Sequence, residues 1–375
     1  MKRRYLSTIV ATGFVAAGLS FAEEADQSLT TEEVIVTATR FEEKEGNGAT
    51  GLTVISRKQI ESSNAKSLVD VLTSIGGVHA RDNSGQANPQ LDLRGFGIGG
   101  DQNTLVLVNG QRISENELLP ANIAAVPPAS IQRIEILRSS GAVLYGGGAT
   151  GGTINIITRS QASGTRSGQL ILGVGSYDGY GAEAALGMAG ETLSLDVAVR
   201  RKETDNYRHN NSLRQDTVNA TARYIAGRDK VSVSVGTDSQ DMRLPGALSA
   251  AQIAADRRAT KFPDDHASLD TEVASIAWSR LLEDLELSAD GAYREKDASG
   301  LVSGGRNAVT GRTRLFSPRA KLTGSLFGGK NSLVFGGDWE DWNYASTVNF
   351  TGFDSDATSI QDNSALYAQD TIQFG

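Results

Sequence analysis

Apolar and polar residues alternate with a period of two along the second half of the chain, from about residue 165 onward. The alternation is clearest over residues 193–200, 231–235 and 285–294. Because successive side chains of a strand point to opposite faces, this pattern predicts strands with one apolar and one polar face. A water-soluble β-sandwich has the same period, so the alternation alone does not distinguish a sandwich from a barrel.

The connections between these strands favour a membrane barrel. Strands of about ten to fourteen residues are joined alternately by short and long links. The short links fall near Gly190, 227–229, 282–284 and 327–330, and the long links cover roughly 204–213, 243–269, 298–312 and 346–360. Transmembrane β-barrels have short periplasmic turns and longer outer loops, whereas a sandwich has no reason to place every long loop at one end.

Aromatic residues lie at or near the predicted strand ends, where the aromatic girdles of membrane barrels are found. These residues are Tyr177, Tyr180, Tyr207, Phe316, Trp339, Trp342, Tyr344, Phe350 and Phe374. Ordinary packing of amphipathic rings is the alternative explanation.

The first half of the mature chain, to about residue 160, has a mixed α/β pattern. Ser56 is placed to cap a helix that carries Ile60, and a second helix is expected near Ser67–Ser74. Short strands are expected at Thr53–Ile55, Leu91–Leu93, Leu105–Val108, Ile131–Leu137 and Thr153–Thr158. Asn109 and Gly110 follow the third of these strands and predict a hairpin turn, because both residue types tolerate positive φ.

The N-terminus has the pattern of a secretion signal. Lys2, Arg3 and Arg4 precede a short apolar run, Ile9–Leu19, and Ser20–Ala22 supplies small residues for a cleavage site. We therefore expect a signal peptide at 1–22 and a mature chain that begins near Glu23 and works outside the cytoplasm. An uncleaved anchor is the alternative, but the run is short for a span of ~20 residues.

Composition excludes several classes of protein. The chain of 375 residues has no Cys, three His and a formal net charge of -8. The lack of Cys excludes disulfides and thiolate metal sites, and the acidic balance argues against nucleic-acid binding. Mean hydropathy of -0.26, with no second long apolar run, excludes a polytopic helical membrane protein.

The predicted number of strands indicates that the barrel in this chain is incomplete. About ten strands are expected, of which Gln361–Phe374 is the last. A closed barrel of that size has an interior filled by side chains and leaves no room for the preceding α/β domain. We therefore expect the chain to be the N-terminal part of a larger protein, with an incomplete antiparallel transmembrane β-barrel. Its expected divisions are 1–22, 23–50, 51–160 and 165–375.

Six separated motifs, in this order, resemble the plug domain of TonB-dependent outer-membrane receptors, particularly siderophore receptors. They are Glu33–Ala38, Leu93–Phe96, Leu105–Gly110, Ile131–Arg138, Leu144–Gly146 and Gly151–Thr158. The resemblance implies a mixed α/β plug (51–160) inside a barrel of about 22 strands, of which this chain carries slightly under half. It also implies the outer membrane of a Gram-negative cell as location and the TonB complex as partner.

The resemblance implies roles for two groups of residues. The segment Glu33, Val34, Ile35, Val36 and Thr37 resembles a TonB box, which adds as a strand to the sheet edge of the partner. The alternative is that Val34–Val36 is the first strand of the plug. Arg94 and Arg138 match arginines that pair with barrel carboxylates, and their partners could lie beyond residue 375. The short stretch before Glu33 implies no additional signalling domain, and therefore a transporter.

Ligand-binding residues are expected in loops that face outward. The polar loop that follows the second helix contains Asp82, Asn83 and Gln86. The segment after the Asn109 hairpin contains Glu115 and Asn116. The first long barrel loop contains Tyr207, Arg208 and His209, which suit an anionic ligand. For each of these residues simple solvation is the alternative.

The leading hypothesis is TonB-coupled import of a scarce iron complex, most plausibly a ferric siderophore. Cobalamin or haem import, a passive porin or adhesin barrel, and a non-functional fragment are the alternatives. Gly95–Gly100 matches a dinucleotide-binding pattern, but a strand rather than a helix follows it. Asp264–His266 is read as solvated loop rather than a metal site. We expect neither an enzyme nor a cofactor.

Overall fold

The chain divides into Met1–Val34 and Ile35–Gly375, and the description here concerns the second unit. The computed structural model describes residues 35–36, 40–41, 43–44, 51–63, 65–82, 88–117, 119–138, 145 and 147–374. The expected signal peptide, Glu33, Val34, Thr37, Asn83 and Gln86 lie outside the described residues. Within the described part of the chain, no helix has both the length and the apolar character needed to cross a bilayer.

A five-stranded sheet forms the centre of the α/β region expected at 51–160, here called the plug. Its strands run in the order β3 (Leu52–Ser56), β8 (Ile131–Leu137), β9 (Gly152–Thr158), β6 (Thr104–Val108) and β7 (Gln111–Arg112). Only β6 and β9 are parallel. The strands predicted at these places are confirmed to within one residue at each end. Asn109 and Gly110 have φ of 51° and 81°, as the predicted hairpin requires.

Two helices cover the plug sheet, and both begin at the predicted serines. Helix α1 (Arg57–Ser62) has Ser56 as its N-cap in a capping box with Gln59. Helix α2 (Leu68–Ser74) begins after Ser67, whose hydroxyl accepts from the Asp70 amide. The helices and the sheet enclose one apolar core. Its fully buried members include Ile55, Val71, Leu72, Ile123, Ile131, Ile134, Ile136, Ile154 and Ile156.

Short elements complete the plug. Strand β4 (His79–Arg81) pairs with β5 (Gln90–Asp92), and three 3₁₀ turns lie at η1 (Gly97–Gly99), η2 (Ile123–Ala125) and η3 (Pro128–Ser130). Strand β1 (Ile35–Val36) pairs with β2 (Glu43–Lys44) in a separate two-stranded ribbon. Ile35 and Val36 are therefore not part of the five-stranded plug sheet. The glycine-rich segment at η1 leads into strand β6, as the sequence predicts.

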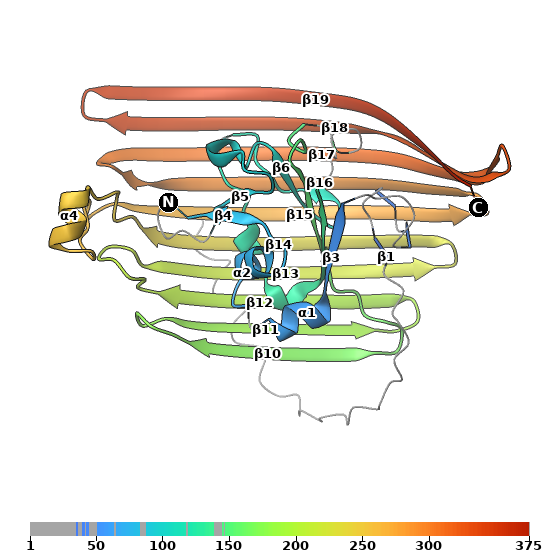
Figure 1. Cartoon of the computed structure of the whole chain (residues 1–375), viewed down its shortest axis with the longest axis horizontal. Helices are drawn as coiled ribbons and strands as arrows, with labels where there is room; N and C mark the ends of the chain where they lie inside the picture. The colour runs from blue at the N-terminus through green and yellow to red at the C-terminus, as the bar shows by residue number, and fades with distance from the viewer. Residues whose placement is uncertain are drawn as a thin grey trace, which may run out of the picture. The chain divides into compact units, whose positions relative to one another are not determined.

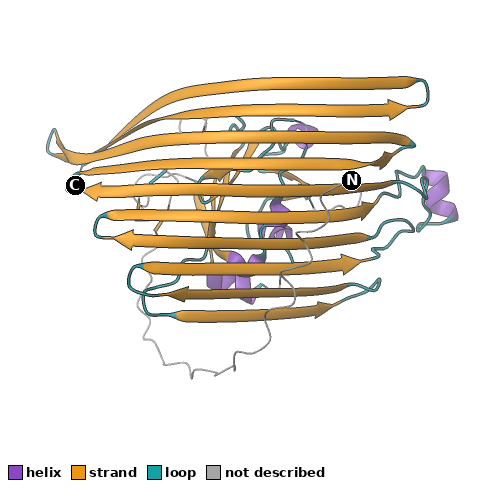
Figure 2. Ribbon diagram, turned by 180° about the vertical axis from the view of Figure 1, so that it is seen from behind, coloured by secondary structure: helices purple, strands orange, loops and turns teal. Residues whose placement is uncertain are grey.

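Ten antiparallel strands form a second sheet, here called the wall. They are β10 (Arg166–Val174), β11 (Tyr180–Ala189), β12 (Leu193–Thr204), β13 (Leu213–Ala226), β14 (Asp229–Arg243), β15 (His266–Leu282), β16 (Leu285–Val302), β17 (Gly305–Leu326), β18 (Gly329–Phe350) and β19 (Phe353–Gln373). Each strand pairs with its sequence neighbour, so the order in space is the order in sequence. Figure 1 shows the plug elements against one face of the wall, and Figure 2 shows the opposite face. The predicted number of strands is confirmed.

Two of the four predicted long loops are wrong. Residues 298–312 and 346–360 are mostly strand, and the connections there are the tight turns at 303–304 and 351–352. The strands of this region run to 22 residues, longer than predicted. Beyond the bilayer both faces of a strand are polar, so the period-two signal disappears although the strand continues. Because β17 and β18 are longer than predicted, four of the aromatic residues lie well inside their strands rather than at the ends. They are Phe316, Trp339, Trp342 and Tyr344.

The two faces of the wall differ in chemistry. The face away from the plug carries exposed apolar side chains at alternate positions, including Leu195, Val199, Val218, Val235, Ile276, Phe316 and Trp339. The face towards the plug carries buried polar side chains, including Gln215, Thr217, Asp238, Gln240, Thr271 and Lys296. This polarity is the reverse of a soluble protein and is that of a membrane barrel, which is apolar outside and polar within.

Candidate functional site: the plug–wall interface

A buried cluster of ions joins the plug segment after β7 to strand β16. Glu115 is bound by Arg294 at 3.1 Å and by Lys296 at 3.4 Å, and Lys296 also contacts Glu117. All four side chains have exposed fractions of 12% or less. Arg294 further donates to the Ile113 carbonyl at 2.7 Å. Because these charges are buried, removal of one partner leaves an unpaired buried ion, which strongly destabilises the folded state.

The predicted ligand residues of this segment face the wall. Glu115 belongs to the ion cluster, and the Asn116 side-chain amide donates to Glu340 of β18 at 2.9 Å. These bonds occupy both side chains in the present conformation. Contact with a ligand therefore stays a prediction that would require a change of partners.

The second attachment point between the plug and the wall is Asn122, an uncharged residue of the plug. The Asn122 amide donates to Asp238 of β14 and to Thr271 of β15, each at 3.1 Å. Asp238 is 2% exposed and also accepts from Gln215 and Gln240 at 2.6 Å. A buried carboxylate with several donors is held in one position, so these bonds fix η2 against strands β13–β15.

A third attachment point is Arg40, which lies between β1 and β2. Its guanidinium donates to both oxygens of Asp338 of β18 at 2.8 Å and lies between the rings of Tyr145 and Tyr367, 4.8 and 4.4 Å from their centroids. Burial alone would lower the pKa of Arg40, but Asp338 outweighs burial and raises it. Burial raises the pKa of Tyr145 to about 12.

Neighbouring side chains reinforce this attachment. Arg319 of β17 donates to the Arg40 carbonyl at 3.1 Å, and its guanidinium lies 5.6 Å from the ring centroid of Phe41. Phe41 is 3% exposed, and Lys321 approaches its ring from β17 as well. Arg40 has φ of 68°, which is unfavourable for a residue other than Gly and is maintained by these contacts.

Helix α1 attaches the opposite side of the plug to the first wall strands. Arg57 donates to the carbonyls of Pro128 and Ile131 and to Gln169 of β10 at 2.5 Å. Glu183 of β11 accepts from the Ala129 amide at 2.6 Å. The plug is thus bound to the wall from β10 to β18.

Arg94 and Arg138 were expected to form the plug–wall lock. Within the described residues, Arg94 donates to the Arg138 carbonyl, and Arg138 donates to Thr53 at 2.7 Å and to the Gly76 carbonyl. These bonds are internal to the plug, so pairing with the barrel stays a prediction. Sequence reasoning missed Arg40, Glu115 and Asn122 as attachment residues, because their wall partners lie more than 100 residues away.

Asp92 organises the Leu93–Phe96 motif. Its carboxylate accepts from the amides of Arg94 and Gly95 at 3.0 and 2.8 Å and from Gly97 at 2.8 Å. Burial alone would raise the pKa of Asp92, but these amide donors outweigh burial and lower it. The sequence pattern did not single out this residue, although an Asp before a glycine-containing turn is a recognisable signal.

The outer-loop candidates have structural partners. Arg208 donates to the carbonyls of Gly246 and Ala259, each at 2.7 Å, and so supports the long loop that contains α4 (Ala250–Ala255). Tyr207 packs edge-to-face on Tyr177 with ring centroids 5.9 Å apart. The His209 amide donates to the Arg258 carbonyl at 2.8 Å. Their ligand-binding role stays a prediction.

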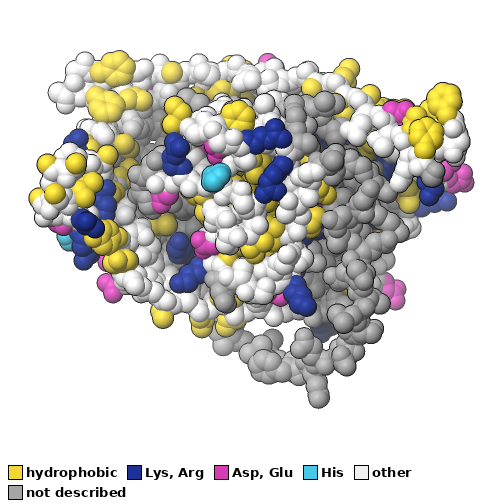
Figure 3. Space-filling view, viewed as in Figure 1, with side chains coloured by type: hydrophobic (Ala, Val, Ile, Leu, Met, Phe, Trp, Pro, Cys, Tyr) yellow, Lys and Arg dark blue, Asp and Glu magenta, His cyan; other side chains and the backbone are white. Residues whose placement is uncertain are grey.

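The remaining loop candidates differ in exposure. Asp82 is exposed at the end of β4. Asp265, expected to be solvated, is 4% exposed and accepts from the amides of Ser303 and Gly304, so it fastens a neighbouring turn. Among the described residues, no group of three His, Asp or Glu is arranged to hold a metal ion. Over α4, Figure 3 shows apolar side chains at the surface, where Ile253 is 44% exposed.

A family model matches most of the segment that contains the five-stranded sheet. Residues 46–153 match the TonB-dependent Receptor Plug Domain. This segment is similar to the plug domain of TonB-dependent receptors. The motifs read from the sequence therefore point to the family that this model describes, and Gly152 and Thr153 at the end of the match begin strand β9.

Curated relatives are similar over about half of the chain or less. The Vitamin B12 transporter BtuB of Vibrio cholerae serotype O1 is 36% identical over 187 residues, which are 49% of this chain and 30% of that protein. The Iron-regulated outer membrane virulence protein of the same species is 33% identical over 161 residues, 41% of this chain and 24% of that protein. The matched residues thus cover less than a third of the length of these relatives.

Solved structures share the fold over most of the chain. The ferric citrate transporter FecA in the unliganded form superposes with a TM-score of 0.76 at 19% identity, over 88% of this chain and 55% of that one. The ferric yersiniabactin uptake receptor FyuA from Yersinia pestis gives 0.71 at 17% identity, over 86% and 54%. These likenesses confirm the predicted fold class, an α/β plug followed by part of an antiparallel β-barrel.

Proposed function

We propose that the chain is the plug and part of the barrel of an energy-coupled importer in the outer membrane of a Gram-negative cell. The observation that carries this proposal is a plug domain bound through polar and charged side chains to the inner face of a wall that is apolar outside. A plug held in this way obstructs diffusion, and its release requires the rupture of bonds such as Arg40–Asp338 and Glu115–Arg294. Work supplied from elsewhere in the cell can provide that rupture.

The proposed source of work is TonB, which would bind the segment Glu33–Thr37. Two features support this assignment. Ile35 and Val36 form a strand outside the plug sheet, and such a strand can exchange its partner for the sheet edge of another protein. The segment is followed by Arg40, so a pull along the chain reaches a residue bound to the wall.

The proposed cargo is a metal chelate too large for passive diffusion, an iron complex such as a ferric siderophore or else cobalamin. The names of the relatives support this class, since one is a vitamin B12 transporter and another is iron-regulated. A passive porin is disfavoured because a plug domain is present. The outer-membrane location is supported by the apolar outer face of the wall.

Deletion of Glu33–Thr37 tests the proposal. Cells that depend on the receptor would be supplied with radiolabelled cobalamin or with a panel of labelled ferric siderophores, and uptake would be compared with that of a strain lacking TonB. The proposal expects the deletion to abolish uptake while binding at the cell surface persists. Uptake that is unaffected by the deletion would identify a passive channel instead.

A further inference from the structure

Arg112 of β7 is a partly buried charge to which the bonds between plug and wall give no partner. Among the residues that the structure describes, its guanidinium has no hydrogen-bond or ion-pair partner, and its Nε atom is closed off from solvent. One of its terminal nitrogens lies beside Gly148, 3.5 Å from the position of an added Cβ. Because an unpaired polar group withdrawn from water destabilises a fold, Arg112 requires an explanation.

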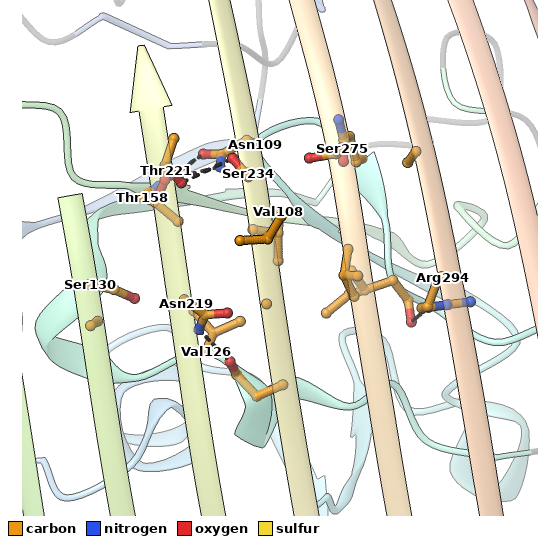
Figure 4. Close-up of a pocket in the computed structure, with 18 of the residues that line it drawn as sticks. Val108, Asn109, Val126, Ser130, Thr158, Asn219, Thr221, Ser234, Ser275 and Arg294 are labelled. Atoms are coloured by element: carbon orange, nitrogen blue, oxygen red, sulfur yellow. Dashed lines mark hydrogen bonds between the residues drawn. The ribbon is translucent and has the colours of Figure 1, made fainter. Parts of the chain in front are cut away.

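Free space lies on two sides of the Arg112 side chain. A cavity of about 160 Å³ is lined by Arg112, Arg294 and Glu340, and another of about 620 Å³ by Arg112, Glu115 and Glu340. Figure 4 shows the smaller cavity, bordered by the Asn109 hairpin of the plug and by Arg294 of the wall. The guanidinium therefore has room to change its direction.

Two carboxylates act on the charge of Arg112, and both are bonded to other groups. Glu115 is bound by the two cations of β16, and Glu340 accepts from two side-chain amides at 2.9 and 3.1 Å. Burial lowers the pKa of Arg112, and the charges of Glu340 and Glu115 offset part of this effect. Arg112 is thus close to both carboxylates in the present conformation and bonded to neither.

The surroundings favour a carboxylate of the protein, rather than an external anion, as the partner of Arg112. The larger cavity is lined by Asp101 and Asp338 in addition to Glu115 and Glu340. An anion that entered this space would meet four negative side chains, and like charges repel strongly where water is scarce.

Glu115 is the carboxylate that stays with Arg112 when the plug moves. The two residues belong to one plug segment and are three positions apart, whereas Arg294 and Lys296 belong to the wall. Movement of the plug away from β16 separates Glu115 from both of its present cations. Arg112 is the only Lys or Arg in residues 104–117, so it is the one cation of this segment that remains beside Glu115.

We propose that Arg112 is the exchange partner of Glu115: as the plug separates from β16, the guanidinium turns to the Glu115 carboxylate and replaces Arg294 and Lys296. This inference rests on the proposed function, because it concerns the movement of the plug during import. A carboxylate that loses its cations before water reaches it is strongly destabilised, and a replacement cation removes that cost. Arg112 thereby lowers the barrier to separation without strengthening the resting interface.

The first test measures import by the complete receptor, supplied with labelled cobalamin or with a panel of labelled ferric siderophores. Arg112→Gln should lower the maximal TonB-dependent uptake rate about tenfold, the effect of about 1.4 kcal/mol on the barrier. The cargo concentration for half-maximal uptake should not change, because the resting receptor binds as before. Arg112→Lys keeps a cation and should retain most of the rate, and Arg314→Gln, at an exposed arginine, should retain all of it.

The second test removes the carboxylate that Arg112 is proposed to receive. In a Glu115→Gln receptor, addition of Arg112→Gln should cause no further decrease in uptake rate. A tenfold decrease that is the same with and without Glu115 would show that Arg112 acts through another group, and would overturn the exchange. Unaltered TonB-dependent uptake by Arg112→Gln would overturn it as well, while the import function stands.

The third test concerns the resting receptor in detergent without TonB. Cargo binding identifies the variants that are folded, and exchange–mass spectrometry then reports on residues 104–117. Arg112→Gln should not increase exchange there, because the resting guanidinium has no bond to lose among the described residues. Increased exchange would assign Arg112 to the resting interface and overturn the proposal. Uptake by the unaltered receptor that never depends on TonB would instead overturn the proposed function, and the exchange with it.

Discussion

Arg40 and Asp338, 298 residues apart in sequence, form a two-point ion pair in which both guanidinium–carboxylate distances are 2.8 Å. The side chains are 9% and 23% exposed, so most of the pair is withdrawn from water. The pair joins the chain just after Val36 to β18, the strand next to the last strand of the wall. It therefore lies between the proposed TonB-binding segment and the plug that TonB would have to move.

Substitution of Arg40 should release this part of the chain. Truncation of one partner of a buried, hydrogen-bonded charge pair costs roughly 2–5 kcal/mol. Arg40→Ala should therefore increase hydrogen exchange of the backbone at 40–44 by about 30-fold or more, since each 1.4 kcal/mol is a factor of ten. Exchange–mass spectrometry of the receptor in detergent would measure the increase.

Two variants provide the comparison for Arg40→Ala. Arg40→Lys keeps the charge but loses the two-point geometry, so it should give an intermediate result. Arg314→Ala removes a pair with Asp341 in which the arginine is 66% exposed, and such surface pairs contribute about 0–1 kcal/mol. Equal exchange at 40–44 in Arg40→Ala and the unaltered receptor would show that the pair does not hold the segment.

The local structure of the plug is predictable from sequence because its signals are local. Ser56 and Ser67 are N-caps at the expected places, and Asn109–Gly110 adopts the positive φ values of the expected turn. Strand β8 has the predicted bounds, Ile131–Leu137. Each of these depends on residues a few positions apart, so the sequence contains the information directly.

The plug–wall bonds could not be predicted in the same way. Asn122 binds Asp238 and Thr271 across 116 and 149 residues, and the alternating pattern does not indicate which inward position faces which plug segment. The extent of β17 and β18 was also underestimated, because polar residues on both faces conceal the continuation of a strand. Long-range register, rather than residue type, limits the prediction of the site.

The ion cluster at Lys296 should show strong coupling between its members. Lys296→Met leaves Glu117, which is 12% exposed, without a cation among the described residues. Loss of one partner of a buried pair costs roughly 3–5 kcal/mol. Adding Glu117→Gln removes the uncompensated charge and should recover part of this loss, with a coupling of roughly 0.5–3 kcal/mol.

Urea unfolding of the receptor monitored by exchange in residues 104–117 would measure these differences. Glu295→Gln on β16 is a suitable control, because its partner Arg312 is 53% exposed and faces away from the plug. A double variant as unstable as the sum of the two single variants would exclude the coupling.

The lowered pKa of Asp92 predicts that the stability of the plug depends on pH. Its pKa lies below the ordinary value of 3.8, because three backbone amides stabilise the carboxylate. A folded-state pKa below the unfolded value adds stability above the unfolded pKa, and this stability is lost as the pH falls through the folded-state pKa. Asp92→Asn should therefore destabilise the plug at pH 7 by about 1–3 kcal/mol, the cost of weakening bonds to a charged acceptor.

The difference between Asp92→Asn and the unaltered receptor should diminish as the pH falls below 3.8. Urea unfolding at a series of pH values, followed by exchange in residues 90–97, would record it. A difference that stays constant through the acid range would show that the ionised carboxylate does not stabilise this turn.

Gly152 at the start of β9 should tolerate no side chain. Its φ is +135°, and an added Cβ would lie 2.4 Å from the Leu137 carbonyl oxygen and 2.9 Å from a Leu93 methyl carbon. A backbone oxygen in the middle of the plug sheet cannot move aside without breaking the β8–β9 pairing. Gly152→Ala should therefore destabilise the plug by about 3 kcal/mol or more, since the variant combines overpacking with backbone strain.

Gly110→Ala separates crowding from strain, because Gly110 also has positive φ (+81°) but has no atom within 4 Å of an added Cβ. This variant should lose only about 1 kcal/mol, the conformational term alone. Thermal unfolding of the two variants would give the comparison. Similar losses for both would show that conformation rather than close packing requires glycine at the start of β9.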